Sequence, residues 1–422
     1  MKKQLYTGLL SLAVLGFSAS ACALDLNEAF FNARINDGKF KGAEADLTIN
    51  NYQATLASTA FFPTASYGFG ANVGTSITAN SAANSRNTLN ISQPIFSLEK
   101  FDQLKQAKPR EEFARSLLMT FEQDLASRLY TAVSNLIVAN EGLKSSETRI
   151  QNLKMQLVRA TRMLELGQGT ITDKRDIQTR YEQAVAGQVT FTINKRNAQM
   201  QIFTLCRIKP ESTDFQLLEK HNTPQIDTFD KIMANVLENN PSLLAAKSTE
   251  EISKLDASRA RNQIMPTVSL GYSRGWGGNA IDSDAMQINV SVPLDATRVI
   301  SRLSADASEV KATEQRRFTE DQLLLQTNQF YESVMLGYQA LQDRRLAVEA
   351  AQLSVEANQR SSKAGVRTMI EVLNSIELLF QSKNDYATTA VTVGTAYLNL
   401  LLLNATPPAE AVALTQKFLF GS

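Results

Sequence analysis

The sequence predicts an internally duplicated α+β protein in which each half joins a pair of β-strands to very long α-helices. Two short stretches, FFPTASYGFG at 61–70 and IMPTVSLGYS at 264–273, read almost alike, and such self-similarity indicates a repeated unit. Each stretch opens a run in which apolar and small polar residues alternate, as in a strand. A second strand pattern follows, and then about 70 residues that favour a long helix because they contain almost no glycine or proline.

The N-terminus, residues 1–23, has the pattern of a secretory signal peptide, with a basic start, an apolar run and small residues before the cleavage point. Cleavage there leaves 24–422 as the mature chain. An alternative is a lipoprotein acylated on Cys22, although Ala19 stands where such signals usually carry leucine. Cleavage after residue 23 would leave Cys206 as the only cysteine. We therefore expect no disulfide within the chain and a thiol that packs as a small apolar side chain.

The mature chain is predicted to consist of two repeats, at about 24–225 and 226–422. Prolines are expected where strands meet helices, and glycines in the turns that follow the long helices. The matching residues are Pro63 and Pro266, Pro94 and Pro293, and Gly167 and Gly365, with Gly169 beside the first of these glycines.

Four strands are predicted, at 64–74, 87–96, 266–276 and 285–294. One face is mainly apolar, and the other carries glycine, serine, threonine and asparagine, which suit the wall of a wet lumen better than a core. Ten residues at about 3.3 Å each, when tilted, span the roughly 25 Å apolar band of an outer-membrane barrel. The smallest bacterial barrels need about eight strands. Four strands therefore either form an ordinary sheet or belong to a barrel that several chains share.

Two very long helices are predicted, at 97–166 and 295–364. Leucine and isoleucine recur every seven residues in the first, from Leu136 to Leu164, which is typical of coiled-coil packing. About 70 residues at 1.5 Å each extend about 105 Å, enough to cross most of a periplasm and more than a globular core requires. The apolar stretch 396–405 is too short for a membrane-spanning helix, so no helical anchor is expected.

The sequence offers little that could support catalysis. Charge is nearly balanced, at 43 basic and 42 acidic residues, so a nucleic-acid partner is not expected. The one histidine, His221, lies in a polar segment and is expected in solvent rather than in a catalytic or zinc site. Ser97 and Lys100 match S-x-x-K but are interpreted as a helix start at the surface. Asp282 and Asp284 are expected in a solvated loop. Because none of these candidates forms a recognisable catalytic or metal-binding set, we predict that the protein is not an enzyme and has no cofactor or metal site.

The turns after the long helices hold the most informative polar residues. GQGTITDKRD offers Thr172 and Asp173, and GVRTMIEVLN offers Arg367, Glu371 and Asn374. Glu371 and Asn374 are three residues apart and so share one face at the start of a helix. An acidic residue at such a position also serves as an ordinary helix cap, and this interpretation stays open for each residue taken alone.

Taken together, these features resemble the TolC family of outer-membrane export channels. The resemblance rests on the signal peptide, the duplicated halves, the strand pairs between coiled-coil helices, and the stretch AGVRTMIEVLNSIELLFQSKNDYA at 364–387. It implies a homotrimer in the outer membrane of a Gram-negative bacterium, in which three chains share a twelve-stranded barrel among the lipids. The helices would form a tunnel through the periplasm, with the mixed segments 207–228 and 405–422 near the equator of this helical barrel.

The resemblance also implies roles for the turn residues. In this family the periplasmic end is closed by inward-coiled helix pairs, with an arginine tied to a threonine–aspartate pair on a neighbouring helix. By motif, Arg367 matches that arginine, and Thr172 and Asp173 match the pair. Glu371 and Asn374 match positions of an acidic ring at the constriction.

The chain departs from the family pattern at two of these positions. Asn374 is uncharged, which leaves Glu371 as the one acidic ring position, and Ser362 stands where some members carry tyrosine in the closing network. Three Glu371 carboxylates near the pore axis should still favour cations. One ring is a weaker filter than two, so modest cation block is expected.

The function implied is a passive export duct that works with a periplasmic adaptor and an inner-membrane ABC or RND transporter. The outer-membrane component of a type I protein secretion system is favoured, because a convincing lipoprotein signal is absent. The alternative is the duct of a multidrug or small-molecule efflux pump. A remote alternative from another class is a periplasmic coiled-coil scaffold without a pore.

Overall fold

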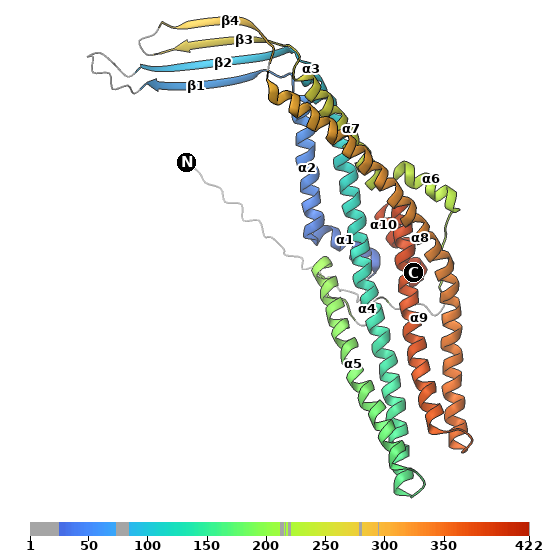
Figure 1. Ribbon diagram of the computed structural model, residues 1–422. Helices are drawn as coiled ribbons and strands as arrows, with labels where there is room; N and C mark the ends of the chain where they lie inside the picture. Colours follow the sequence, from blue (N-terminus) through green and yellow to red (C-terminus); the bar gives the residue numbers. More distant parts are fainter. Residues whose placement is uncertain are drawn as a thin grey trace, which may run out of the picture.

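The computed structural model describes residues 25–72, 84–211, 215, 217, 221–277, 281–293 and 295–421. The expected signal peptide, with Cys22, lies outside these residues, and so do the ends of two expected strands, at 73–74 and 294. In the described part, a four-stranded sheet forms one end of a long helical body and two helical hairpins form the other end (Figure 1).

The order of the elements in the first half recurs in the second. The first half contains α1 Leu26–Asn36, α2 Gly38–Ser58, β1 Thr64–Asn72, β2 Asn84–Phe96, α3 Leu98–Lys105, α4 Ala107–Glu165 and α5 Ile171–Cys206. The second contains α6 Phe229–Asn239, α7 Pro241–Asn262, β3 Thr267–Trp276, β4 Ser283–Ser291, α8 Ala296–Lys363, α9 Met369–Leu403 and, in addition, α10 Pro408–Leu419. The fold class predicted from the sequence, paired strands joined to long helices, is confirmed.

The sheet is an antiparallel meander in the order β1-β2-β3-β4. Its register places Tyr67 opposite Leu89, and Leu270 opposite Ile288. Because side chains alternate along every strand, this register gathers the apolar residues of the four strands on one face. Glycine and small polar residues gather on the other face.

Two expected positions in the sheet need correction. Asp284 lies in β4 rather than in a loop, and its carboxylate is 3.7 Å from the Arg274 guanidinium on the apolar face.

Pro94 lies inside β2 rather than at the junction with a helix. The pairing of β2 with β3 shifts between Pro94 and Phe96. Proline has no N–H to complete the ladder, which explains this irregularity. The prolines that do lie between a helix and a strand are Pro63, Pro266 and Pro293.

The helix expected over 97–166 is divided at Gln106, between α3 and α4. Pro109 lies in the first turn of α4, where its missing N–H is tolerated, whereas a helix continuing from α3 would lose a hydrogen bond there. The buried Gln106 side chain donates a hydrogen bond to the Asp256 carboxylate of α7 at 2.8 Å. Tertiary contact with α7 thus stabilises the break.

The start of α3 is capped as the sequence indicates. Ser97 Oγ accepts a hydrogen bond from the Lys100 N–H at 3.3 Å. Ser97 is nevertheless buried, so its expected position at the surface was wrong. The other long helix, α8, runs without a break.

The main core lies where α1, α4, α9 and α10 meet. Among the described helices, α9 is the one long and apolar enough to cross a membrane, and 56% of its most apolar window is buried inside the structure. Most of the stretch 396–405 therefore lies in a 35-residue helix that ends at Leu403, and it is not a short isolated segment. Packing in the core accounts for its apolar composition. Gly394 of α9 lets Tyr130 of α4 approach closely, because a Cβ at residue 394 would overlap the tyrosine hydroxyl.

Cys206 and His221 both lie in this region of the molecule. Cys206 is buried at the end of α5, where its thiol donates to the Ala29 carbonyl at 3.2 Å and burial raises its pKa to about 12. His221 was expected in solvent, but only 4% of it is exposed. Its Nε2 lies 3.0 Å from the Tyr386 hydroxyl, and its ring packs beside Phe418 of α10. Removal from water lowers the pKa of His221.

Burial of His221 predicts a loss of stability on acidification. An unfolded histidine takes up a proton below about pH 6.5, whereas the folded protein resists this uptake because its His221 pKa is lower. The free energy of unfolding should therefore fall as the pH drops from 7 to 5, by at most about 1.4 kcal/mol per pH unit per chain. Thermal unfolding followed by circular dichroism would measure this. His221→Gln should flatten the dependence, and an equal slope in both proteins would contradict the prediction.

Candidate functional site

The two helical hairpins turn at the end of the molecule opposite the sheet (Figure 1). Gly167 ends α4 with φ 69°, and Gly365 ends α8 with φ 77°. This left-handed conformation favours glycine and stops a helix. Gly169 lies where a Cβ would be only 3.2 Å from the Met163 Cβ and the Leu164 nitrogen. The three glycines thus allow tight turns after α4 and α8.

Each helix that leaves a turn is capped by threonine and an acidic residue. Thr170 Oγ1 accepts from the Asp173 N–H at 3.1 Å and donates to the Asp173 carboxylate at 2.7 Å. Thr368 and Glu371 form a reciprocal capping box, in which the Thr368 N–H donates to Glu371 at 2.8 Å. This N–H, and then the Arg367 guanidinium, lower the pKa of Glu371. Glu371 is therefore ionised at neutral pH.

The five residues matched to a closing network all lie at or next to these turns. Within one copy, Arg367 pairs with Glu371 of its own helix start, and Asp173 bonds to its own cap. Thr172 and Asn374 are exposed. Arg367 and the Thr172–Asp173 pair are thus not in contact within the chain, and the link to a neighbouring helix that the resemblance implies stays a prediction.

Sequence reasoning missed a polar stripe on α4, which we define as Ser145, Arg149, Asn152, Gln156 and Arg159. Their spacing of four, three, four and three residues places them on one face of the helix. This face lies against the α8–α9 hairpin, whereas the neighbouring leucines pack on α5. The alternating spacing of polar residues beside a leucine heptad was the available signal.

The strongest contact of the polar stripe is an ion pair between Arg149 and Glu377 of α9. Their nearest side-chain atoms are 2.7 Å apart, and the arginine and glutamate side chains are only 19% and 34% exposed. The guanidinium also stacks 4.6 Å from the centre of the Phe380 ring. An ion pair that is partly shielded from water is stronger than one on an open surface.

Three other residues of the polar stripe form neutral or backbone contacts across the same boundary. Arg159 donates to the carbonyl oxygen of Ser362, the last turn of α8, at 2.9 Å. The other two pairs are Ser145 with Asn384 at 3.2 Å and Asn152 with Gln359 at 3.2 Å. The stripe therefore joins the α4–α5 hairpin to the α8–α9 hairpin down to the turns.

The family model described as outer membrane efflux protein matches residues 31–206 and 232–405, which together make up most of the chain. The chain belongs to the outer membrane efflux protein family. One matched segment lies in each half of the chain, in agreement with the order of elements that recurs in the two halves. Members of this family are outer-membrane channels and transport proteins, so the resemblance seen in the sequence is confirmed.

Relatives of this outer membrane efflux protein are similar over nearly its whole length. Outer membrane protein TolC of Escherichia coli (strain K12) is 22% identical over 414 residues, which cover 91% of this chain and 83% of TolC. The alkaline protease secretion protein AprF of Pseudomonas aeruginosa is 21% identical, with 94% of this chain and 88% of AprF covered. The crystal structure of the Campylobacter jejuni CmeC outer membrane channel has a TM-score of 0.77 at 12% identity, covering 99% of this chain and 97% of CmeC. The fold is that of TolC-like outer-membrane channels.

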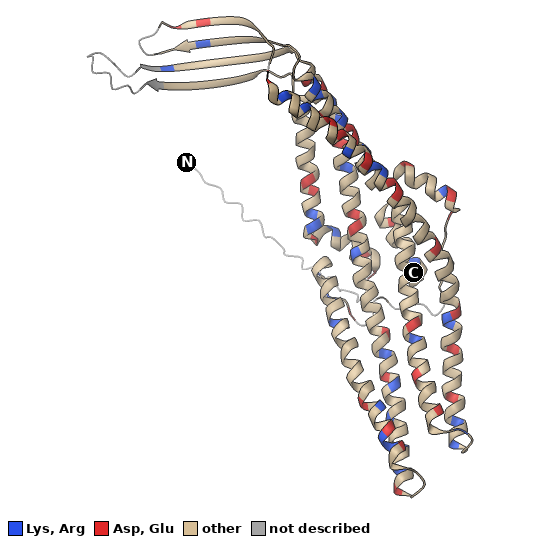
Figure 2. Ribbon diagram, in the orientation of Figure 1, with Lys and Arg blue, Asp and Glu red and all other residues tan. Residues whose placement is uncertain are grey.

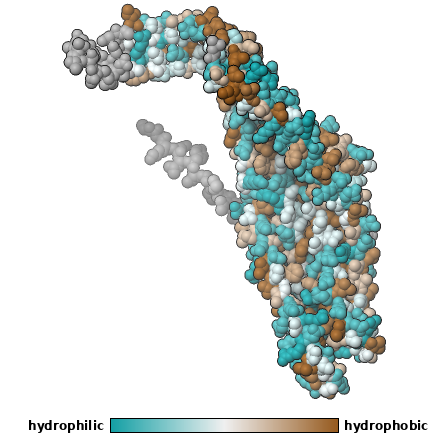
Figure 3. All heavy atoms as spheres, viewed as in Figure 1, coloured by the Kyte–Doolittle hydropathy of each residue, from teal (hydrophilic) through white to brown (hydrophobic). Residues whose placement is uncertain are grey.

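As an outer membrane efflux protein, the chain places its sheet in the outer membrane and its helices in the periplasm. The apolar face of the sheet suits lipid, since Tyr67 is 64% and Ile288 is 70% exposed. Apolar residues also gather where the sheet meets the helices (Figure 3). Phe62 and Phe96 are exposed there, at the level expected of an aromatic girdle.

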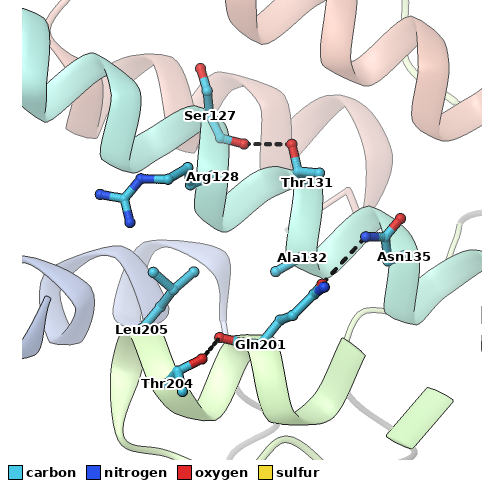
Figure 4. Close-up of a pocket in the computed structure, with 8 residues that line it drawn as sticks. All are labelled: Ser127, Arg128, Thr131, Ala132, Asn135, Gln201, Thr204 and Leu205. Carbon is cyan, nitrogen blue, oxygen red and sulfur yellow. Dashed lines mark hydrogen bonds between the residues drawn. The ribbon is translucent and has the colours of Figure 1, made fainter. Parts of the chain in front are cut away.

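Charged side chains of this outer membrane efflux protein are spread along the helices and are sparse on the sheet (Figure 2). A groove of about 400 Å³ lies between α4 and the end of α5, and most of its polar side chains are hydroxyls and amides. Among them, Asn135 and Gln201 bond across it at 3.4 Å (Figure 4). Its one guanidinium, Arg128, is already paired with Asp37. Among the described residues, no cluster of metal-ligating side chains is found.

Proposed function

We propose that three copies of this channel protein close into one export duct. The observation that carries the proposal is that, in the described sheet, β1 and β4 each have a partner on one side only. Copies joined head to tail through these edges form a ring when the rotation closes. Three copies supply twelve strands, which is sufficient for a membrane-spanning barrel.

The helices support the same ring, because apolar side chains are exposed along both edges of the bundle. α8 forms one edge, and α2 with α5 forms the other (Figure 1). Exposed on α8 are Val310, Leu325, Leu336 and Leu353, and on α2 and α5 are Tyr52, Leu56, Val189 and Met200. Burying such surface contributes about 25 cal/mol per Å².

We infer that the cargo is polypeptide, exported as in type I secretion, with a periplasmic adaptor and an inner-membrane ABC transporter. The support is the similarity to AprF, which is named for alkaline protease secretion. The duct itself acts passively, with no catalytic step and no cofactor. Efflux of small molecules with an RND or ABC pump is the alternative that the experiment below separates.

The periplasmic gate is proposed at the helix turns. The polar stripe holds the two hairpins of each copy together, and Arg367 links to Thr172 and Asp173 of the neighbouring copy. Glu371 and Asn374 line the constriction, where ionised Glu371 favours cations and uncharged Asn374 keeps this preference modest. Docking of the adaptor and pump on the turns competes with these links, and the hairpins then move apart.

Arg367→Ala is expected to raise single-channel conductance in planar bilayers severalfold. The substitution removes the cation that ties neighbouring copies, while the Thr368–Glu371 capping box keeps the turn folded. Thr172→Ala should give a smaller increase in the same direction. A conductance equal to that of the unaltered protein would argue against the gate assignment.

The cargo is tested with a deletion strain examined in two ways. Its secreted proteins are compared with those of the parent, and its sensitivity to dyes, detergents and antibiotics is measured. Loss of one large secreted protein with unchanged drug sensitivity supports secretion. Broad drug sensitivity with normal secretion supports efflux instead, and a heat-sensitive trimer extracted from the outer membrane excludes the scaffold without a pore.

A further inference from the structure

The polar face of the sheet carries a single charged side chain. We define this lumen face as the side opposite the exposed apolar residues. Its described members other than Arg86 are glycine, serine, threonine, asparagine, glutamine, alanine and Pro94. The other two charged residues of the strands, Arg274 and Asp284, lie on the apolar face and pair with each other at 3.7 Å. Arg86 is therefore isolated among neutral neighbours on this face.

The sheet holds the Arg86 guanidinium flat against its surface. A Cβ at Gly275 of β3 would lie 2.6 Å from Arg86 Nη2, so the glycine leaves the space that the guanidinium occupies. Nη2 reaches past β3 and donates to the Ser283 hydroxyl of β4 at 3.0 Å. On its other side, Arg86 is paired with Gly70 of β1. The side chain is thus positioned by two glycines and a serine, and among the described residues it has no acidic partner within ion-pair distance.

Arg86 lies near the outer end of the sheet. Arg86 is the third residue of β2, and the other end of this strand leads into α3. Arg86 is therefore almost a full strand length away from the helices. The connections at that end, 73–83 and 277–282, contain one charged residue, Asp282. Its carboxylate is 3.4 Å from the Gly277 N–H, within its own turn. The positive charge on the lumen face is therefore not cancelled by a paired acid.

We propose that three copies of Arg86 form a cationic ring inside the outer end of the barrel, and that this ring binds polyanions. The inference rests on the proposed trimer, which turns the polar face inward. A guanidinium offers several N–H donors to phosphate or carboxylate oxygens, and Ser283 satisfies only one of them. Ions with several negative charges would interact with the ring most strongly, because the attraction grows with the charge of the ion and the lumen face carries no fixed acid to cancel it. Anionic solutes that enter from the outer end would then be held there.

Planar bilayers with the purified channel test the ring. Inositol hexakisphosphate is added in 0.1 M KCl, either on the side of the sheet or on the side of the helix turns. Addition on the sheet side is expected to block the current, and 1 M KCl should weaken the block because salt screens the charges. Arg86→Gln should raise the half-blocking concentration by about tenfold, whereas Arg86→Lys should retain most of the block.

Arg274→Gln is the matched control, because it removes an arginine at a similar depth on the opposite face of the same sheet. Its half-blocking concentration should stay within about twofold of that of the unaltered channel. Equal block in Arg86→Gln and in the unaltered channel would overturn the proposal, as would equal loss of block in both arginine variants. A purified protein that gives no conductance at all would instead refute the proposed duct. The two failures are therefore distinguishable.

Discussion

Arg149→Ala is expected to open the periplasmic end of the channel, with a closed-to-open ratio that falls on the order of a hundredfold or more. The partly buried pair with Glu377 and the contact with Phe380 together contribute about 1–2 kcal/mol in each copy. Three copies that move together would lose about 3–6 kcal/mol of closed-state stability. Single-channel recordings measure the open fraction directly.

Arg344→Ala provides the control for this variant. Arg344 pairs with Asp385 at 2.9 Å, but that pair joins α8 to α9 within one hairpin and both side chains are about half exposed. Its removal should leave gating unchanged. The assignment of the polar stripe would be wrong if both variants changed the open fraction equally. The double variant Arg149→Ala with Glu377→Ala should have about the same open fraction as Arg149→Ala alone, because the single substitution already removes the ion pair.

Gly394→Ala is expected to destabilise the folded chain by about 2–3 kcal/mol. The added Cβ would overlap the Tyr130 hydroxyl and would lie 2.8 Å from Leu419, so α9 would have to move away from both α4 and α10. The yield of assembled channel and its thermal unfolding midpoint should both fall. Tyr130→Phe in the same chain should restore part of the loss, because it removes the oxygen that the methyl group meets.

Gly187→Ala tests whether a methyl group in a helix is harmful in itself. A Cβ at Gly187 of α5 would meet nothing within 4 Å. Because alanine favours helix over glycine, this substitution should be neutral or stabilising by up to about 1 kcal/mol. Similar losses in both variants would show that close packing at Gly394 is not the cause.

The strands and long helices could be predicted because each depends on a local pattern. Alternation with a glycine- and serine-rich face marks a strand whatever its neighbours are, and β1 begins at the expected residue, Thr64. The division between α3 and α4 has a local signal in Pro109, but the position of the break at Gln106 could not be predicted from that signal alone. It depends on the contact of Gln106 with Asp256, which is 150 residues away in the chain.

The site was predicted only where chemistry is local. Threonine and an acidic residue at a helix start are visible as a cap, and Glu371 forms that cap. The partners of Arg149 and Arg159 lie on helices more than 200 residues away, so a sequence pattern marks the polar stripe but not what it binds. His221 was misjudged because its polar neighbours in sequence are not its neighbours in space.

The two open edges of the sheet have a genetic consequence. Because no copy closes a barrel alone, the behaviour of each assembled channel depends on every chain that it contains. If altered and normal chains are made in equal amounts and mix freely, only about one channel in eight contains three normal copies. A substitution that damages the gate without preventing assembly should therefore be dominant over the normal gene, whereas one that prevents folding should be recessive.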